Sequence, residues 1–120
     1  MKKRLTLVSL WFPVFLWCGV IYGLSSIHHL RFFKADLLDF LFRKIGHMVE
    51  YGVLARLLAR AFTGSTFWPW KKIFAASLVS AALYSCTDEF HQAFVAGRHG
   101  TPRDVVIDTV GAWLALGLKP

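Results

Sequence analysis

The sequence predicts an all-α fold: an integral membrane four-helix bundle with a short interfacial helix between its first two spans, in a single domain over residues 1–120. First, 56% of the 120 residues are hydrophobic and 16% are aromatic, which is more than a soluble domain of this length can cover with polar side chains. Second, residues 5–26 contain no charged residue, and about 20 apolar residues suffice to cross a bilayer. Third, other apolar segments follow, and exposed irregular backbone is not tolerated in hydrocarbon.

The first span is residues 5–26, which follow the basic flank Met1-Lys2-Lys3-Arg4. Such a flank also begins a cleavable signal peptide, but no Ala-x-Ala cleavage site follows it here. We therefore expect the segment to be retained as a membrane span. Gly19 and Gly23 form a Gly-x-x-x-Gly pair within it, which allows close helix packing and leaves a dimer open as the oligomeric state.

The connection between the first two spans, residues 28–44, carries apolar residues at helical spacing. Leu30, Phe33 and Leu37 lie three and four positions apart, with charged residues between them. This pattern favours a short helix in the membrane interface. An ordinary connecting loop with incidental apolar residues is the alternative.

The remaining spans are expected at residues 45–62, 73–90 and 105–118. Gly64 and Pro69 mark a short turn after the second span. Pro102 lies where the first turn of a helix accepts proline, just ahead of the fourth span.

Titratable residues are distributed unequally between the two sides of this bundle. Four spans bring the connections 28–44 and 91–104 to one side, and all seven acids and all five histidines fall nearer that side. The opposite side carries eight of the 14 basic residues. Because basic residues favour the cytoplasm, we expect a multi-pass protein of the cell membrane with both termini cytoplasmic. The net charge of +7 reflects such flanking anchors and predicts no nucleic-acid partner.

Polar residues converge from three helices on the acidic side. His47, Glu50 and Tyr51 are three and four positions apart and share a face of the second span. Asp88 and His91 are three positions apart and share a face at the end of the third span. Asp104 and Asp108 follow at the start of the fourth. This spacing predicts one outward-facing polar pocket.

Within this pocket we expect Glu89 and His91 to act as an acid–base pair and Arg98 to bind an anionic group. His47 and Glu50 are expected to support them. The catalytic candidates are therefore Glu89, His91, His47, Glu50 and Asp88, and the substrate-binding candidates are Lys44, Tyr51, Gln92, Arg98, Asp104 and Asp108. The alternative is a structural ion network that joins the helices, because such networks resemble sites.

Metal binding is a third interpretation of the same residues. His47-x-x-Glu50 and Asp88-x-x-His91 offer nitrogen and oxygen donors of the kind that bind zinc, manganese or iron. No His-Glu-x-x-His motif is present, and spacing alone often misleads. We assign no metal ligand on this basis, and the sequence names no cofactor.

These residues together resemble the VanZ-like family of small bacterial membrane proteins. The resemblance rests on Lys44-x-x-His47-x-x-x-Tyr51, on Asp88-Glu89-x-His91-Gln92, and on Arg98, Asp104, Asp108 and Gly111. The family takes its name from a protein associated with resistance to teicoplanin, a lipoglycopeptide antibiotic.

The resemblance implies a membrane protein, in contact with membrane lipids, that binds and processes an amphiphilic or lipid-linked molecule of the cell envelope or a lipoglycopeptide. A non-catalytic scaffold or partner-binding protein is the alternative.

Overall fold

Four helices make up the fold. The computed structural model describes residues 7–25, 36–92, 94 and 102–117. The helices are α1 (Leu7–Ser25), α2 (Asp36–Ser65), α3 (Trp70–Gln92) and α4 (Pro102–Gly117). The described residues include no strand, so the predicted all-α, four-helix architecture is confirmed.

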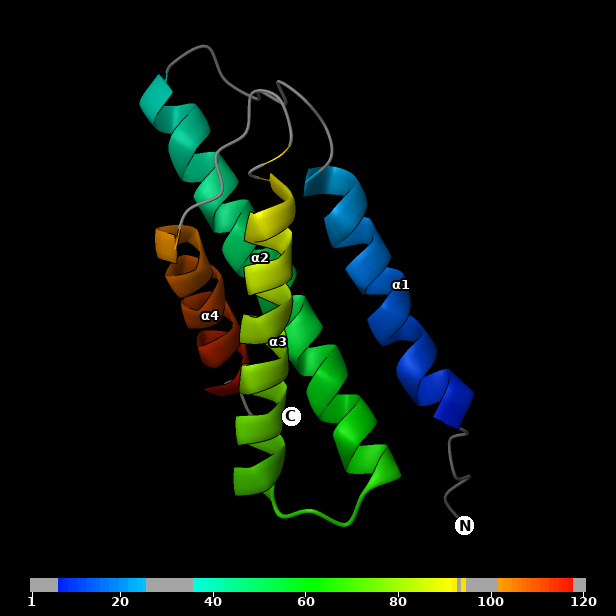
Figure 1. The fold of residues 1–120 in the computed structure, drawn as a ribbon. Helices are drawn as coiled ribbons and strands as arrows, with labels where there is room; N and C mark the ends of the chain where they lie inside the picture. Colours follow the sequence, from blue (N-terminus) through cyan, green and yellow to red (C-terminus); the bar gives the residue numbers. More distant parts are fainter. Residues whose placement is uncertain (1–6, 26–35, 93, 95–101, 118–120) are drawn as a thin grey trace.

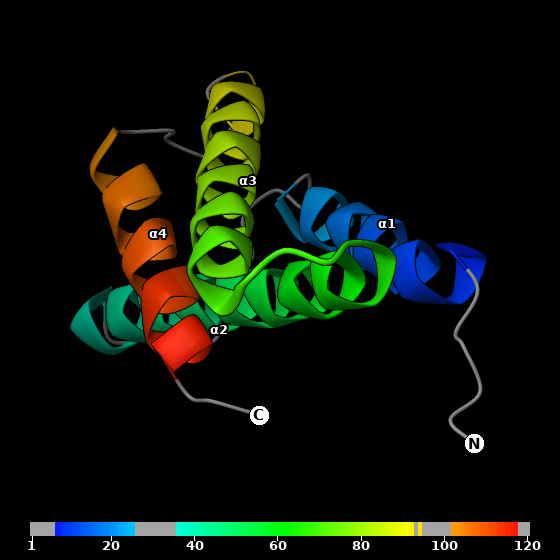
Figure 2. The same ribbon diagram turned by 90° about the horizontal axis from the view of Figure 1, so that it is seen from below.

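Successive helices run in opposite directions (Figure 1). Seen along the bundle, α1 and α4 lie on opposite sides of α3, and α2 runs across the other three (Figure 2), all of which it contacts. At one end of the bundle α1 and α3 finish and α2 and α4 begin, and we call this the acidic end. The opposite end, where α2 finishes and α3 begins, we call the basic end.

The second helix is longer than expected. It begins at Asp36 and continues without interruption to Ser65, over 30 residues, so residues 36–44 do not form a separate interfacial helix. The apolar spacing that suggested such a helix simply continues into the span, because no proline interrupts residues 36–65. The part of the predicted interfacial helix at residues 28–35 lies outside the described residues.

Close packing of α2 against α4 depends on glycine. A Cβ atom added to Gly111 would lie 2.5 Å from the carbonyl oxygen of Met48, and one added to Gly52 would lie 3.1 Å from Ala115 Cβ. The two backbones therefore approach closely at this crossing, as in other helix pairs joined by small residues. Gly19 and Gly23, by contrast, have nothing within 4 Å of an added Cβ, so the predicted dimer through them stays a prediction.

A proline in α1 creates one of the contacts with α2. Pro13 lies inside the helix and has no N–H to donate to the carbonyl of Ser9, four positions earlier. Arg60 Nη1 on α2 donates to that same oxygen at 3.2 Å. The α1–α2 contact thus satisfies a carbonyl that the α1 sequence itself releases.

The bundle has an apolar core, which includes Leu10, Leu54 and Leu116, but it also buries polar side chains and exposes large apolar ones. Polar side chains are buried at Ser77, Ser85, Asp88, Glu89 and Asp108. Large apolar side chains are exposed on all four helices, among them Phe15 at 70%, Leu37 at 69% and Phe90 at 70%.

By length and mean hydropathy together, no helix in the described part of the chain reaches the standard of a membrane-crossing segment. Insertion into a membrane stays a prediction.

Candidate functional site

Six polar side chains meet between α2, α3 and α4, toward the acidic end, and we call them the polar cluster: His47, Tyr51, Ser85, Asp88, Glu89 and Asp108. Helical spacing brings them there. Residues 47 and 51 are one turn apart on α2, and residues 85, 88 and 89 lie three and four apart on α3. All but His47 are at most 5% exposed.

Asp108 of α4 links the other two helices. Its Oδ1 lies 3.1 Å from His47 Nδ1, and its Oδ2 accepts a hydrogen bond of 2.7 Å from Ser85 Oγ. A carboxylate that is ionised only accepts hydrogen bonds, so in that state of Asp108 the hydrogen of this contact belongs to Nδ1. The imidazole is thereby held in one orientation, with Nε2 left as its second polar atom.

Asp88 is held in a similar way. Tyr51, which is fully buried, donates its hydroxyl hydrogen to Asp88 Oδ2 at 3.0 Å. Burying a carboxylate costs several kcal/mol unless hydrogen bonds or charges compensate it. Tyr51 and Ser85 each donate a hydrogen bond to a carboxylate on another helix. These two bonds offset part of the cost of burying Asp88 and Asp108.

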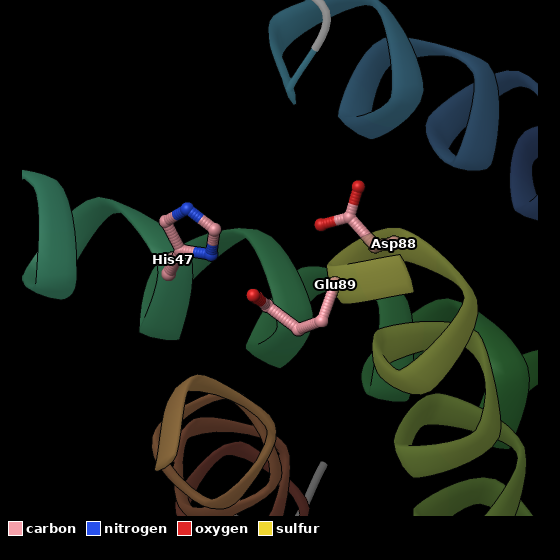
Figure 3. Close-up of side chains that lie close together, drawn as sticks. All are labelled: His47, Asp88 and Glu89. Atoms are coloured by element: carbon pink, nitrogen blue, oxygen red, sulfur yellow. The ribbon is translucent and has the colours of Figure 1, made fainter. Parts of the chain in front are cut away.

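His47, Asp88 and Glu89 form the centre of the cluster. Their side chains extend from α2 and α3 toward a common space (Figure 3), and each offers one donor atom within 4.8 Å of the other two. One imidazole nitrogen and two carboxylates can transfer protons to and from a bound molecule. They are also donors of the kind that hold a divalent metal ion.

Five of the eleven sequence-predicted site residues come together here: His47, Tyr51, Asp88, Glu89 and Asp108. His91 is placed elsewhere, with its ring stacked on Tyr22 of α1 at a centroid distance of 4.3 Å. The proposed pairing of Glu89 with His91 stays a prediction.

Other predicted residues lie around the cluster or beyond the described part. Lys44 and Glu50 are half-buried on α2, and the backbone carbonyl of Glu50 accepts a 2.8 Å bond from Trp17 Nε1. Gln92 and Asp104 belong to α3 and α4, but their side chains lie outside the described residues, as does the whole of Arg98.

Ser85 was missed by the site prediction. Its signal is weak, because a serine among small apolar residues is ordinary in a packed helix. The one signal in the sequence is its position three residues before Asp88, which places the two side chains on the same face of α3.

A second feature lies beside the cluster, on the adjoining face of α2. It is an apolar groove of about 1020 Å³, and its lining includes Leu10 of α1, Val49 and Val53 of α2, and Leu114 of α4. Its charged lining residues are Arg56 and Arg60, whose guanidinium groups donate to Ala115 O at 3.4 Å and Ser9 O at 3.2 Å. Most of the other lining residues are apolar.

Among known proteins, the family model described as VanZ/LLP1 matches residues 4–119. No curated protein and no solved structure matches the chain. The matched region includes all four helices and the whole polar cluster.

Proposed function

Because the chain belongs to the VanZ/LLP1 family, we propose that it is a membrane protein that binds an amphiphilic, lipid-linked molecule of the cell envelope and processes it at the polar cluster. The observation that carries this proposal is the arrangement of His47, Asp88 and Glu89 around one space inside a bundle of apolar exterior. Charged side chains in such surroundings usually mark a site of function.

The apolar exterior supports the membrane location. Soluble monomers rarely expose contiguous apolar surface beyond a few hundred Å², whereas α1 alone exposes Phe12, Phe15 and Leu16 at 57–70%. In the hydrocarbon of a bilayer, exposing such apolar side chains carries no hydrophobic penalty. The uncharged stretch at residues 5–26 and the basic residues near the N-terminus and the α2–α3 turn support insertion with both termini in the cytoplasm.

His47 is the proposed proton-transfer group. Asp108 orients its ring, which is the role a carboxylate takes beside a catalytic histidine. Asp88 and Glu89 then face the reacting part of the bound molecule, and the apolar groove on the adjoining face of α2 receives its chain. A lipoglycopeptide such as teicoplanin is an amphiphile of this class, and we propose antibiotic resistance as the cellular outcome.

Cells that express variants at matched membrane levels test this function. We expect His47→Ala and Asp88→Asn to lose the change in envelope lipids and in teicoplanin susceptibility that the wild type produces. Thr87→Ala is the matched control, because Thr87 is exposed, adjoins Asp88 and donates its hydroxyl hydrogen to Tyr84 O within its own helix. Unchanged lipids and susceptibility in the first two variants would contradict the proposal.

A structural role for the cluster is the second candidate. It is favoured by Asp108, which joins α4 to α2 through His47 and to α3 through Ser85. In that case the loss of phenotype in each variant follows its loss of folded protein, and the two measurements on the same variants separate the candidates.

A further inference from the structure

We propose that His47, Asp88 and Glu89 bind a divalent transition-metal ion of the zinc or manganese class. This proposal rests on the proposed function in one respect, which is that both place their chemistry at the polar cluster. It deepens that function by naming the group that would contact an anionic or carbonyl oxygen of the bound molecule.

The positions of the donor atoms carry the proposal first. The three atoms lie within 4.8 Å of one another and come from two helices that pack together. Donors at about 2.0–2.2 Å from one tetrahedral ion are about 3.3–3.6 Å apart, so the three side chains must approach one another to close the site. Figure 3 shows all three side chains directed at the same space.

Burial and charge are the second argument. Asp88 is 3% exposed and Glu89 is 5% exposed, and both are consecutive on α3. Two ionised carboxylates side by side in a buried place repel each other. An ion of charge +2 placed between two such carboxylates reduces that repulsion, and metal coordination is one of the ways in which proteins keep charged groups buried.

The residues behind the three donors are the third argument. Asp108 contacts His47 Nδ1, and Tyr51 donates to one oxygen of Asp88. Ligating carboxylates are usually hydrogen-bonded themselves, and a carboxylate beside a ligating histidine fixes the orientation of its ring. Asp108 and Tyr51 are thus positioning residues in this proposal.

The donor set also indicates the kind of site. One nitrogen and two carboxylate oxygens suit zinc, manganese or ferrous iron better than copper(I). Three protein ligands leave positions open, which is typical of catalytic rather than structural metal sites. When bound, such an ion polarises a phosphoryl or carbonyl oxygen.

Metal counting on the full-length protein in detergent tests the proposal. Protein stripped with a chelator is dialysed against Zn²⁺ or Mn²⁺, and the bound metal is measured by mass spectrometry. We expect about one ion per chain. Asp108→Asn should weaken binding by about 10–100-fold, as for other outer residues, and Asp88→Asn and Glu89→Gln by at least as much.

Thr87→Ala is the matched control, since Thr87 adjoins Asp88 on α3 but is exposed and donates its hydroxyl hydrogen to Tyr84 O within its own helix. Its affinity should equal that of the wild type. Less than about one-tenth of an ion per chain in the wild type, or equal binding by Glu89→Gln, would overturn the site.

A spectroscopic measurement covers the case in which the variants do not fold. Mn²⁺ bound to the wild type should show the ¹⁴N coupling of one histidine in pulsed electron paramagnetic resonance, and its absence overturns the assignment of His47. If the wild type binds no metal but the His47→Ala variant still loses the lipid phenotype, the metal site is wrong and the proposed function is supported. A protein that binds metal but produces no lipid phenotype would support the metal site and contradict the proposed function.

Discussion

Asp108 shows how much of the bundle depends on one buried side chain. It is fully buried, and its two oxygens receive groups from two other helices, His47 Nδ1 and Ser85 Oγ. Hydrogen bonds to a charged partner contribute about 1.5–3 kcal/mol each, and a buried group left without its partner costs a similar amount. Side chains at this junction therefore affect stability and site geometry together.

Asp108→Asn is expected to lower the free energy of unfolding by about 1–3 kcal/mol, because an amide has one carbonyl oxygen and accepts at only one of the two positions. Thermal unfolding in detergent measures it. Ser85→Ala alone should cost about 1 kcal/mol, and in the Asp108→Asn background less, because the two residues share a bond. Additive losses would show that the Ser85–Asp108 bond contributes nothing.

Spacing predicted much of the site at this scale, but not which side of Asp88 faces inward. At about 100° per residue, Ser85 and Glu89 lie on one side of Asp88 around α3, and His91 lies on the other. Both sides satisfy the rule that residues three or four apart are neighbours. The positions of α2 and α4 determine which side of α3 is buried, and these positions cannot be read from the sequence of α3 alone. Hence Ser85 was missed and His91 was grouped with Asp88.

At the scale of elements, the four helices follow from apolar segments and from their breaks. Pro69 lies in the connection between α2 and α3, and its carbonyl accepts from the N–H groups of Lys72 and Ile73. The helix α2 is longer than the predicted span at residues 45–62, because the charged residues between 36 and 44 do not interrupt the helix. The close helix contacts were not predicted either. Gly19 and Gly23 match a known motif, yet Gly111 and Gly52 lie at the crossing of α2 and α4, and Gly64 lies against Leu10 of α1. A motif within one helix does not identify its partner.

The proline in α1 leads to a prediction about helix pairing. Arg60→Ala should lower the free energy of unfolding, because the Ser9 carbonyl loses the hydrogen bond from the Arg60 guanidinium. In a Pro13→Ala background the cost should fall, since the substitution restores a backbone N–H that donates to that carbonyl within the helix. A double-mutant cycle by thermal unfolding measures the coupling. Arg56→Ala is the control, because Arg56 donates to Ala115 O in α4, and its cost should not depend on residue 13.

At the scale of the whole molecule, the acids of the described helices are confined to one end of the bundle, whereas basic residues occur at both ends. Every acid in the described helices belongs to residues 36–50, 88–89 or 104–108, near the acidic end, whereas Arg60, Lys71 and Lys72 lie near the basic end. Sequence was sufficient for this distribution, because four alternating helices fix which segment ends share a side. The proposed orientation in a membrane rests on the same distribution, since basic flanks favour the cytoplasmic face.

Cysteine labelling tests that orientation. In a chain with Cys18 and Cys86 replaced by alanine, Phe94→Cys places a thiol near the acidic end, and Phe67→Cys places one at the α2–α3 turn; the native side chains there are 76% and 95% exposed. With a maleimide that does not cross membranes, intact cells should label residue 94 and not residue 67, and permeabilised cells should label both. Because both positions are exposed, a difference between them reflects the barrier rather than burial. Labelling of 67 alone would invert the orientation, and equal labelling in intact cells would mean that the bundle does not separate two compartments.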